Sequence, residues 1–164
     1  MTIADRIAIV ADGRTIEEGS PRDIYECPNR RFAAEFIGEN NVLDGRVLSQ
    51  NGRYLQIDVN GTSIDITAPA ELASPSSEVA ISIRSELMRL ALRESAIGHS
   101  MQGTMATYLE GVYLGITTMH LVRLPDGKEI AVRSLSDGSG DGRLEPGQEV
   151  RITWDTDKAR LHLG

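Results

Sequence analysis

The side chains best suited to chemistry are few and widely spaced. Three histidines, His99, His120 and His162, have no second histidine or cysteine at the spacing that metal sites use, so we predict no metal-binding residues. His120 falls in an alternating segment, and we expect it on the solvent side. The single cysteine, Cys27, can form no disulfide within the chain and has no neighbouring base, so we expect a partly buried packing residue and not a nucleophile.

One loop has the oxygen-bearing residues of a calcium site. Asp137, Ser139 and Asp141 stand at the first, third and fifth positions of such a loop. Its twelfth position is Gln148, which cannot supply the bidentate carboxylate, and no helices are predicted on either side. We therefore expect a plain surface loop.

The chain lacks the residues of a nucleotide site. A phosphate-binding loop needs a glycine-rich turn that ends in Gly-Lys-Ser or Gly-Lys-Thr ahead of a helix. The only lysines are Lys128 and Lys158, and neither stands in that context. No nucleophile, base and orienting acid combine in a pattern typical of hydrolases or transferases. We predict no catalytic residues and no bound cofactor in this chain.

Two short motifs are candidate contacts with a ligand or a partner subunit. Arg84 and Glu86 stand two residues apart at the end of a predicted strand, where an ordinary ion pair is the alternative. Tyr113 and Gly115 form the second motif. Here the alternative is a turn that closes a barrel, with Gly115 at positive φ.

The first forty residues predict a hairpin and two short helices. Residues 7–10 and 14–17 form the hairpin strands, joined by a tight turn at Asp12-Gly13. Ser20 begins a helix that runs to about residue 26, because Pro21 and Asp23 follow it in the pattern of a capping box.

The second helix is predicted over residues 30–37, with Asn29 as its N-cap and Gly38 just beyond its end. One face of this helix should carry Phe32, Ala33, Phe36 and Ile37. A hairpin and two small helices cannot bury a core alone, so this segment should be poorly packed or lean on the rest of the chain.

From residue 41 the pattern changes to short alternating segments between turns, which predicts a mainly β fold. The pattern runs twice, and each run closes on a similar strand, VAISIR at residues 79–84 and VRITWD at residues 150–155. The simplest interpretation is an internal duplication of a small OB-like β-barrel, over about 41–95 and 101–164.

Three parts of the chain carry a resemblance to a known family. The run DRIAIVADGRTIEEGSPRDIYECPNRRFAAEFIG resembles the end of the nucleotide-binding domain in ATP-binding subunits of ABC importers, most similar to the polyamine group. The run GTMATYLEGVYLGITTMHLVRLPDGKEIAVR and the following LEPGQEVRITWDTDKARLHL resemble the TOBE domain of these subunits, a barrel like that of molybdate-binding proteins. A third match is Ile83-Arg84-Ser85-Glu86, which resembles the family's I-R-P-E sequence except that Ser85 stands in place of the proline.

The resemblance implies a C-terminal fragment: residues 1–40 as the remnant of the nucleotide-binding domain and residues 41–164 as a TOBE domain. It implies a homodimer through the barrels, contact of the parent with transmembrane permease subunits, and ATP and Mg²⁺ only in the missing part. The parent would be a transport ATPase that imports a small solute such as a polyamine. The alternative is a module that senses a small ligand or a molybdate-like oxyanion.

The composition excludes two further classes of protein, those that bind nucleic acid and those that span a membrane. The net charge is −7 and the chain has one tryptophan, four tyrosines and two phenylalanines, whereas single-stranded nucleic acid needs a cationic groove with stacked aromatic residues. No apolar run approaches the roughly 20 residues that span a bilayer. We therefore expect no nucleic acid partner, no direct membrane insertion and a cytoplasmic location, at the inner face of the membrane through partners.

Overall fold

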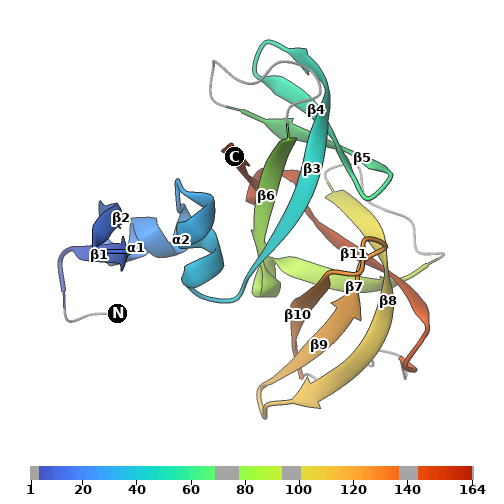
Figure 1. Ribbon diagram of the computed structural model, residues 1–164. Coiled ribbons are helices and arrows are strands. Elements are labelled where there is room, and N and C mark those ends of the chain that lie inside the picture. Colours follow the sequence, from blue (N-terminus) through green and yellow to red (C-terminus); the bar gives the residue numbers. More distant parts are fainter. Residues whose placement is uncertain (1–3, 69–77, 94–100, 137–143, 164) are drawn as a thin grey trace.

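The computed structural model describes residues 4–68, 78–93, 101–136 and 144–163. A small N-terminal segment lies beside two five-stranded antiparallel sheets, and the linker into the first sheet begins at the end of the second helix (Figure 1). The mainly β fold is confirmed. The candidate calcium ligands Asp137, Ser139 and Asp141 lie outside the described residues, whereas Gln148, the twelfth position of that loop, lies within them.

The N-terminal segment contains the hairpin and the two helices that were predicted. They are β1 (Ile7–Ala11), β2 (Arg14–Gly19), α1 (Pro21–Glu26) and α2 (Arg31–Phe36). Asp12 and Gly13 have φ of 49° and 72°, the positive values that a two-residue hairpin turn requires. The main-chain N–H of Asp23 donates to Oγ of Ser20 at 3.1 Å, so Ser20 caps α1.

The prediction that Asn29 caps the second helix is wrong. Arg30 occupies the N-cap position and makes no side-chain cap, and the buried carboxylate of Glu17 takes over this role. It accepts hydrogen bonds from the main-chain N–H groups of Asn29 at 2.8 Å and Arg30 at 3.0 Å. A cap donated by β2 thus ties the start of α2 to the hairpin.

The apolar face predicted for α2 is right for Ala33 and Ile37, which pack against Ile9 and Ile24, and wrong for the two phenylalanines. Ala33 and Ala34 are the buried residues of the helix, whereas Phe32 and Phe36 are exposed and stack on each other with ring centroids 6.0 Å apart. Residues four apart share a face of a helix, so the two phenylalanines point the same way, about 100° from Ala33. Cys27 is exposed as well, contrary to expectation.

The first sheet has the strand order β12-β6-β3-β4-β5. Its strands are β3 (Asn40–Asn51), β4 (Tyr54–Val59), β5 (Thr62–Thr67), β6 (Glu78–Arg84) and β12 (Arg160–Leu163). The second sheet has the order β10-β9-β8-β11-β7. Its strands are β7 (Met88–Leu92), β8 (Met101–Tyr113), β9 (Thr117–Arg123), β10 (Glu129–Leu135) and β11 (Glu149–Asp155).

The two sheets exchange their last strands. After β6, the short 3₁₀ turn η1 (Ser85–Leu87) leads into β7, which pairs with β11 of the second sheet. After β11, the turn η2 (Thr156–Lys158) leads into β12, which pairs with β6 of the first sheet. The sheets therefore do not coincide with the predicted repeats, residues 41–95 and 101–164. Each sheet takes four strands from one repeat and its last strand from the other.

The two sheets have the same strand order when the second is read from its other end: β12-β6-β3-β4-β5 corresponds to β7-β11-β8-β9-β10. A duplication would produce this correspondence. The long strands β3 and β8 each contain a bulge, between Val47 and Ser49 and between Tyr108 and Glu110. In the register with the V-x-I strands, Val79 lies opposite Gly45 and Val150 lies opposite Ala106. These matches support the predicted duplication as a proposal about the origin of the fold.

One continuous core joins the sheets. Its buried members come from both, including Leu43, Ile57 and Ile81 from the first sheet and Val122 and Trp154 from the second. Trp154 is fully buried. Because a shared core and exchanged strands must form together, we expect the two sheets to unfold as one unit.

Candidate functional site at the joint between the N-terminal segment and the barrels

Arg84, at the end of β6, attaches α1 to the first barrel. It is nearly buried, with 9% of its surface exposed. Its Nη1 donates to the carbonyl oxygen of Tyr25 at 3.0 Å, and its guanidinium lies 3.6 Å from the centroid of the Tyr25 ring. Its Nε donates to Oε1 of Glu86 at 2.5 Å. The structure thus brings Arg84 and Glu86 together, and the arginine holds another part of the same chain.

The linker after α2 is held on both sides. The main-chain N–H of Ser85 donates to the carbonyl of Glu39 at 2.9 Å, and Arg133 of β10 pairs with the Glu39 carboxylate. A Cβ on Gly38, which has φ of 75°, would lie 3.3 Å from the Tyr25 ring. The linker, residues 37–39, is therefore held close to Tyr25, Ser85 and Arg133 between α2 and β3.

Asn41 closes the edge of the second sheet. Its side-chain amide donates to the carbonyl of Ala131 at 2.6 Å and accepts from the N–H of the same residue at 3.0 Å. The side chain is buried. One asparagine from the first sheet thus satisfies both main-chain groups of a residue on edge strand β10, as a paired strand would.

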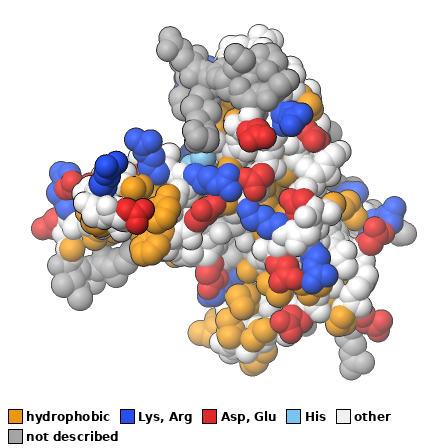
Figure 2. Space-filling model, viewed as in Figure 1, with side chains coloured by type: hydrophobic (Ala, Val, Ile, Leu, Met, Phe, Trp, Pro, Cys, Tyr) orange, Lys and Arg blue, Asp and Glu red, His pale blue; other side chains and the backbone are white. Residues whose placement is uncertain are grey.

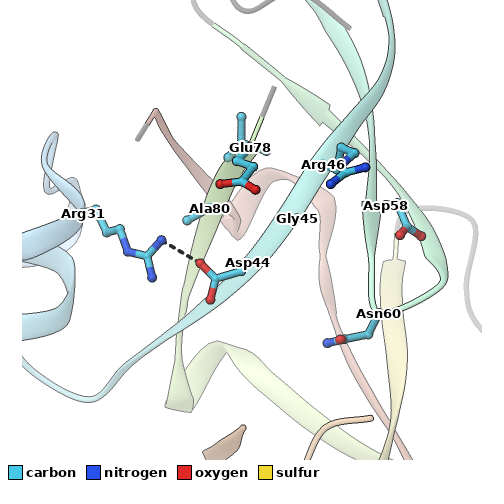
Figure 3. Close-up of a pocket in the computed structure, with 9 residues that line it drawn as sticks. Arg31, Asp44, Gly45, Arg46, Asp58, Asn60, Glu78 and Ala80 are labelled. Carbon is cyan, nitrogen blue, oxygen red and sulfur yellow. Dashed lines mark ion pairs between the residues drawn. The ribbon is translucent and has the colours of Figure 1, made fainter. Parts of the chain in front are cut away.

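A charged network attaches α2 to β3 on the other side of the joint. Arg31 pairs with Asp44 at 2.6 Å, and Lys128 from the turn before β10 pairs with the same carboxylate at 3.3 Å. Partial burial opposes ionisation of Asp44, but its hydrogen bonds with Arg31 and Lys128 outweigh burial and hold its pKa below the usual value. Figure 3 shows Arg31 reaching from α2 to Asp44. Both residues line a hollow of about 560 Å³.

His162 on β12 is buried at the same joint. Its Nε2 lies 2.7 Å from Oγ of Ser82, and only 1% of its surface is exposed. Burial lowers its pKa below 6.5, and the nearby main chain of Asn29 and carboxylate of Glu17 partly oppose this shift. The neutral imidazole is therefore the form that fits the folded chain.

Acidification should weaken the fold through His162. Its pKa is lower in the folded than in the unfolded chain, so the unfolded chain binds more protons and the free energy of unfolding falls as pH drops below about 6.5. The His162→Gln variant should lose this part of the pH dependence. Urea unfolding of both proteins between pH 8 and pH 5.5 checks it, and equal slopes against pH would rule the effect out.

Loss of Arg84 should loosen the joint. Arg84→Met removes the charged hydrogen bond and the cation–π contact with Tyr25, which together contribute about 2–3 kcal/mol at a buried site. We expect urea unfolding at lower concentration and faster proteolysis before residue 40. Arg89→Met is the matched control, because that side chain is 67% exposed and lies 3.9 Å from Asp155. Equal effects of the two substitutions would contradict the role of Arg84.

The second sequence motif lies elsewhere. Tyr113 and Gly115 stand at the hairpin between β8 and β9, at the far end of the second sheet from the exchanged strands (Figure 1). Gly115 has φ of 87°, as expected for the turn, and 71% of Tyr113 is exposed. The two motifs thus do not form one site.

Most residues of the joint were not found from the sequence. Tyr25, Glu39 and Asn41 were given no role, because their partners lie far away in the chain. The partner of Asn41, for example, is Ala131, 90 residues further on. His120 is also buried, against expectation. Alternate residues of a strand face the same side, and Val122 and Leu124 are buried. The alternation therefore indicated that His120 is buried too.

Within the described ranges, no three histidine, cysteine, aspartate or glutamate residues lie close enough to hold a metal ion. In the same ranges, no helix combines the length and apolar character that a membrane crossing requires.

These features define a domain of two five-stranded sheets that exchange strands, attached to a short α/β segment, and the comparisons name its class. Residues 81–161 match the TOBE domain family, so the chain carries a TOBE domain. Nearly the whole chain also matches the C-terminal region of ATP-binding proteins of spermidine/putrescine ABC importers.

Two such relatives have the name spermidine/putrescine import ATP-binding protein PotA. The protein from Ruegeria pomeroyi is 32% identical over 161 residues, which cover 98% of this chain and 42% of the relative. The protein from Roseobacter denitrificans is 35% identical over 163 residues, which cover 98% of this chain and 44% of the relative. The chain thus spans about two-fifths of the length of these relatives.

A solved structure supports the fold. The cytoplasmic molybdate-binding protein ModG aligns with a TM-score of 0.63 over 76% of this chain and 96% of that chain. The sequence identity of 16% limits this similarity to the fold alone.

Proposed function

We propose that this chain is the C-terminal regulatory and dimerisation part of an ABC importer ATPase subunit. The parent would couple ATP hydrolysis to import of a small solute such as a polyamine, with ATP and Mg²⁺ bound outside residues 1–164. The chain itself would not catalyse a reaction. The match to importer ATP-binding proteins across 98% of the chain supports this proposal.

The contacts between the N-terminal segment and the sheets are the observation that supports a mechanism for the proposed function. Arg84 holds α1, and Asp44 holds α2 through Arg31, so the N-terminal segment and the barrels are tied at two separate points. A rotation of an ATPase domain attached to the N-terminal segment would therefore be carried to the barrels. In the proposed cycle the barrels keep two subunits together while the ATP sites open.

The exposed phenylalanines fit a contact with that ATPase domain. Phe32 is 43% and Phe36 is 68% exposed, and Figure 2 shows hydrophobic side chains gathered over α2. Leaving two stacked aromatic rings in water is costly, because a buried aromatic side chain contributes about 1.5–3 kcal/mol. Residues 1–40 would then be the last part of a nucleotide-binding domain.

The proposal implies a set of partners and a place in the cell. The barrels would meet a second copy, and the parent would meet transmembrane permease subunits at the inner face of the bacterial membrane. The protein would be cytoplasmic and would reach the membrane only through those subunits. No nucleic acid partner is proposed for a chain with a net charge of −7.

Light scattering of the purified chain over a concentration series tests the association. We expect the mass to rise from that of a monomer toward that of a dimer. A mass of one chain at every concentration would reject unaided association of the barrels and leave a ligand sensor or a passive spacer as the better account.

The second candidate function is a sensor of a small oxyanion of the molybdate type. A cavity of about 50 Å³ near the joint favours it, because three cationic side chains line it against a single carboxylate. The cations are Arg84, Lys158 and Arg160, and the carboxylate is that of Glu26. Titration calorimetry with molybdate distinguishes the two functions. Heat that saturates at one oxyanion per chain would favour the sensor, and its absence would favour the association module.

A further inference from the structure

A second exposed apolar surface lies at the end of the second sheet. Five side chains form what we call the tip surface: Val112, Tyr113, Leu114, Ile116 and Leu135, with exposed fractions of 39%, 71%, 51%, 82% and 69%. Figure 2 shows hydrophobic side chains gathered at the lower end of the molecule, over the hairpin between β8 and β9. Such a contiguous patch is typical of an interaction site.

The backbone holds the tip surface in one shape. The N–H of Leu114 donates to the carbonyl of Thr117 at 2.8 Å, which closes the hairpin. The N–H of Ser136 donates to the carbonyl of Ile116 at 2.8 Å, which fixes the end of β10 beside the hairpin. Little conformational freedom would be lost when this surface is covered, and a preformed surface favours binding.

The tip surface is uncharged in a strongly acidic chain. Residues 111–119 and 134–136 contain no aspartate, glutamate, lysine or arginine, although the whole chain has a net charge of −7. Two copies of an acidic chain repel each other wherever charged surfaces approach. An uncharged apolar patch is where they can meet with the least repulsion, and depletion of charge is the mark of an interface core.

We propose that the tip surface is where two copies of this chain meet, each covering the tip of the other. This inference rests on the proposed function and deepens it by naming the contact surface of the dimer. The same residues would face each other about a two-fold axis, as in most homodimers. Tyr113 is the one aromatic residue among these five, and tyrosine is among the residue types that contribute most at interfaces.

The size of the surface fits a weak dimer. Five large side chains with roughly 100 Å² exposed each give about 500 Å² per copy, or about 1,000 Å² for two copies, which is at the lower limit of specific interfaces. Such a dimer should exchange with monomer as concentration changes. A lipid surface fits less well, because a patch that enters a membrane usually has lysine or arginine at its border.

Sedimentation analysis of the full chain over a concentration series tests the inference. The double variant Tyr113→Ser, Ile116→Ser should raise the dimer dissociation constant roughly tenfold or more. The matched control is Tyr54→Ser, Leu48→Ser on the first sheet, where Tyr54 is 72% and Leu48 is 49% exposed. The control should keep the dissociation constant within about twofold of the original. A third variant, Phe36→Ser, should leave it unchanged and removes association through α2.

The outcomes separate the inference from the proposed function. If the unsubstituted chain dimerises and the tip variant does so equally well, association stands and the tip surface is rejected. If the unsubstituted chain stays monomeric, both are rejected for this chain alone. If it instead floats with phospholipid vesicles while monomeric, the tip surface binds lipid and the inference is overturned. Cooperative urea unfolding of each variant shows that it is folded.

A distance measurement gives an independent result. With Cys27→Ser as background, a nitroxide label on Ile116→Cys should lie closer to its copy in the dimer than a label on Tyr54→Cys. A longer distance for the tip label than for the Tyr54 label would contradict the inference. This readout depends on position within the dimer, so a general loss of stability would not imitate it.

Discussion

Fragments of residues 1–93 and 101–164 should each fail to fold alone and should form native β structure when they are mixed. The reason is the exchange of strands: β7 pairs with β11, and β12 pairs with β6, across the cut. Each fragment alone would leave one strand without its partner and one side of its sheet uncovered, which favours aggregation. A sequence repeat by itself would predict two fragments that fold independently.

Circular dichroism and urea unfolding of the fragments, separately and mixed, check this prediction. The intact chain is the control for the native spectrum. A cooperative unfolding transition in either isolated fragment would contradict the account of the fold. It would mean that the exchanged strands are accessories to two self-sufficient barrels.

Replacing Trp154 with alanine should have the largest effect of any single substitution. The side chain is fully buried in the core that joins both sheets, and truncation of such a residue usually costs about 3–5 kcal/mol. Among the described atoms, its Nε1 has no hydrogen-bond partner. Trp154→Phe removes that unpaired donor along with some volume, so it should cost less, about 1–2 kcal/mol.

Urea unfolding followed by circular dichroism measures both variants, because Trp154 is the only tryptophan and fluorescence would be lost with it. Tyr54→Ala is the control: its side chain is 72% exposed and should change the free energy of unfolding by about 0.5 kcal/mol or less. If Trp154→Ala were as mild as the control, Trp154 would not be the residue that joins the sheets.

Local features could be predicted from the sequence because neighbours in the chain determine them. The turn at Asp12-Gly13, the cap at Ser20 and the positive φ of Gly115 each depend on a few adjacent residues. The alternation of the β segments likewise gave the mainly β fold. These predictions needed no knowledge of what the elements pack against.

The features that could not be predicted depend on contacts between residues far apart in the chain. Alternation shows that β7 and β12 are strands, but it does not say which sheet receives them. The cap of α2 comes from Glu17, twelve residues before Asn29, and not from the residue next to the helix. Arg84 was singled out as a candidate contact with a ligand or a partner subunit, with an ion pair to Glu86 as the alternative. Its contact with Tyr25 spans 59 residues and could not be predicted from local spacing.

The most direct test of the account uses a chimaera. The matching C-terminal region of the Ruegeria pomeroyi relative is replaced by this chain, and ATP-dependent spermidine uptake is measured in cells that lack their own copy. The account predicts uptake well above that of the truncated relative, and a loss of uptake when the chimaera carries Arg84→Met. A folded, abundant chimaera with no more uptake than the truncated relative would contradict the proposal that this chain serves an importer ATPase.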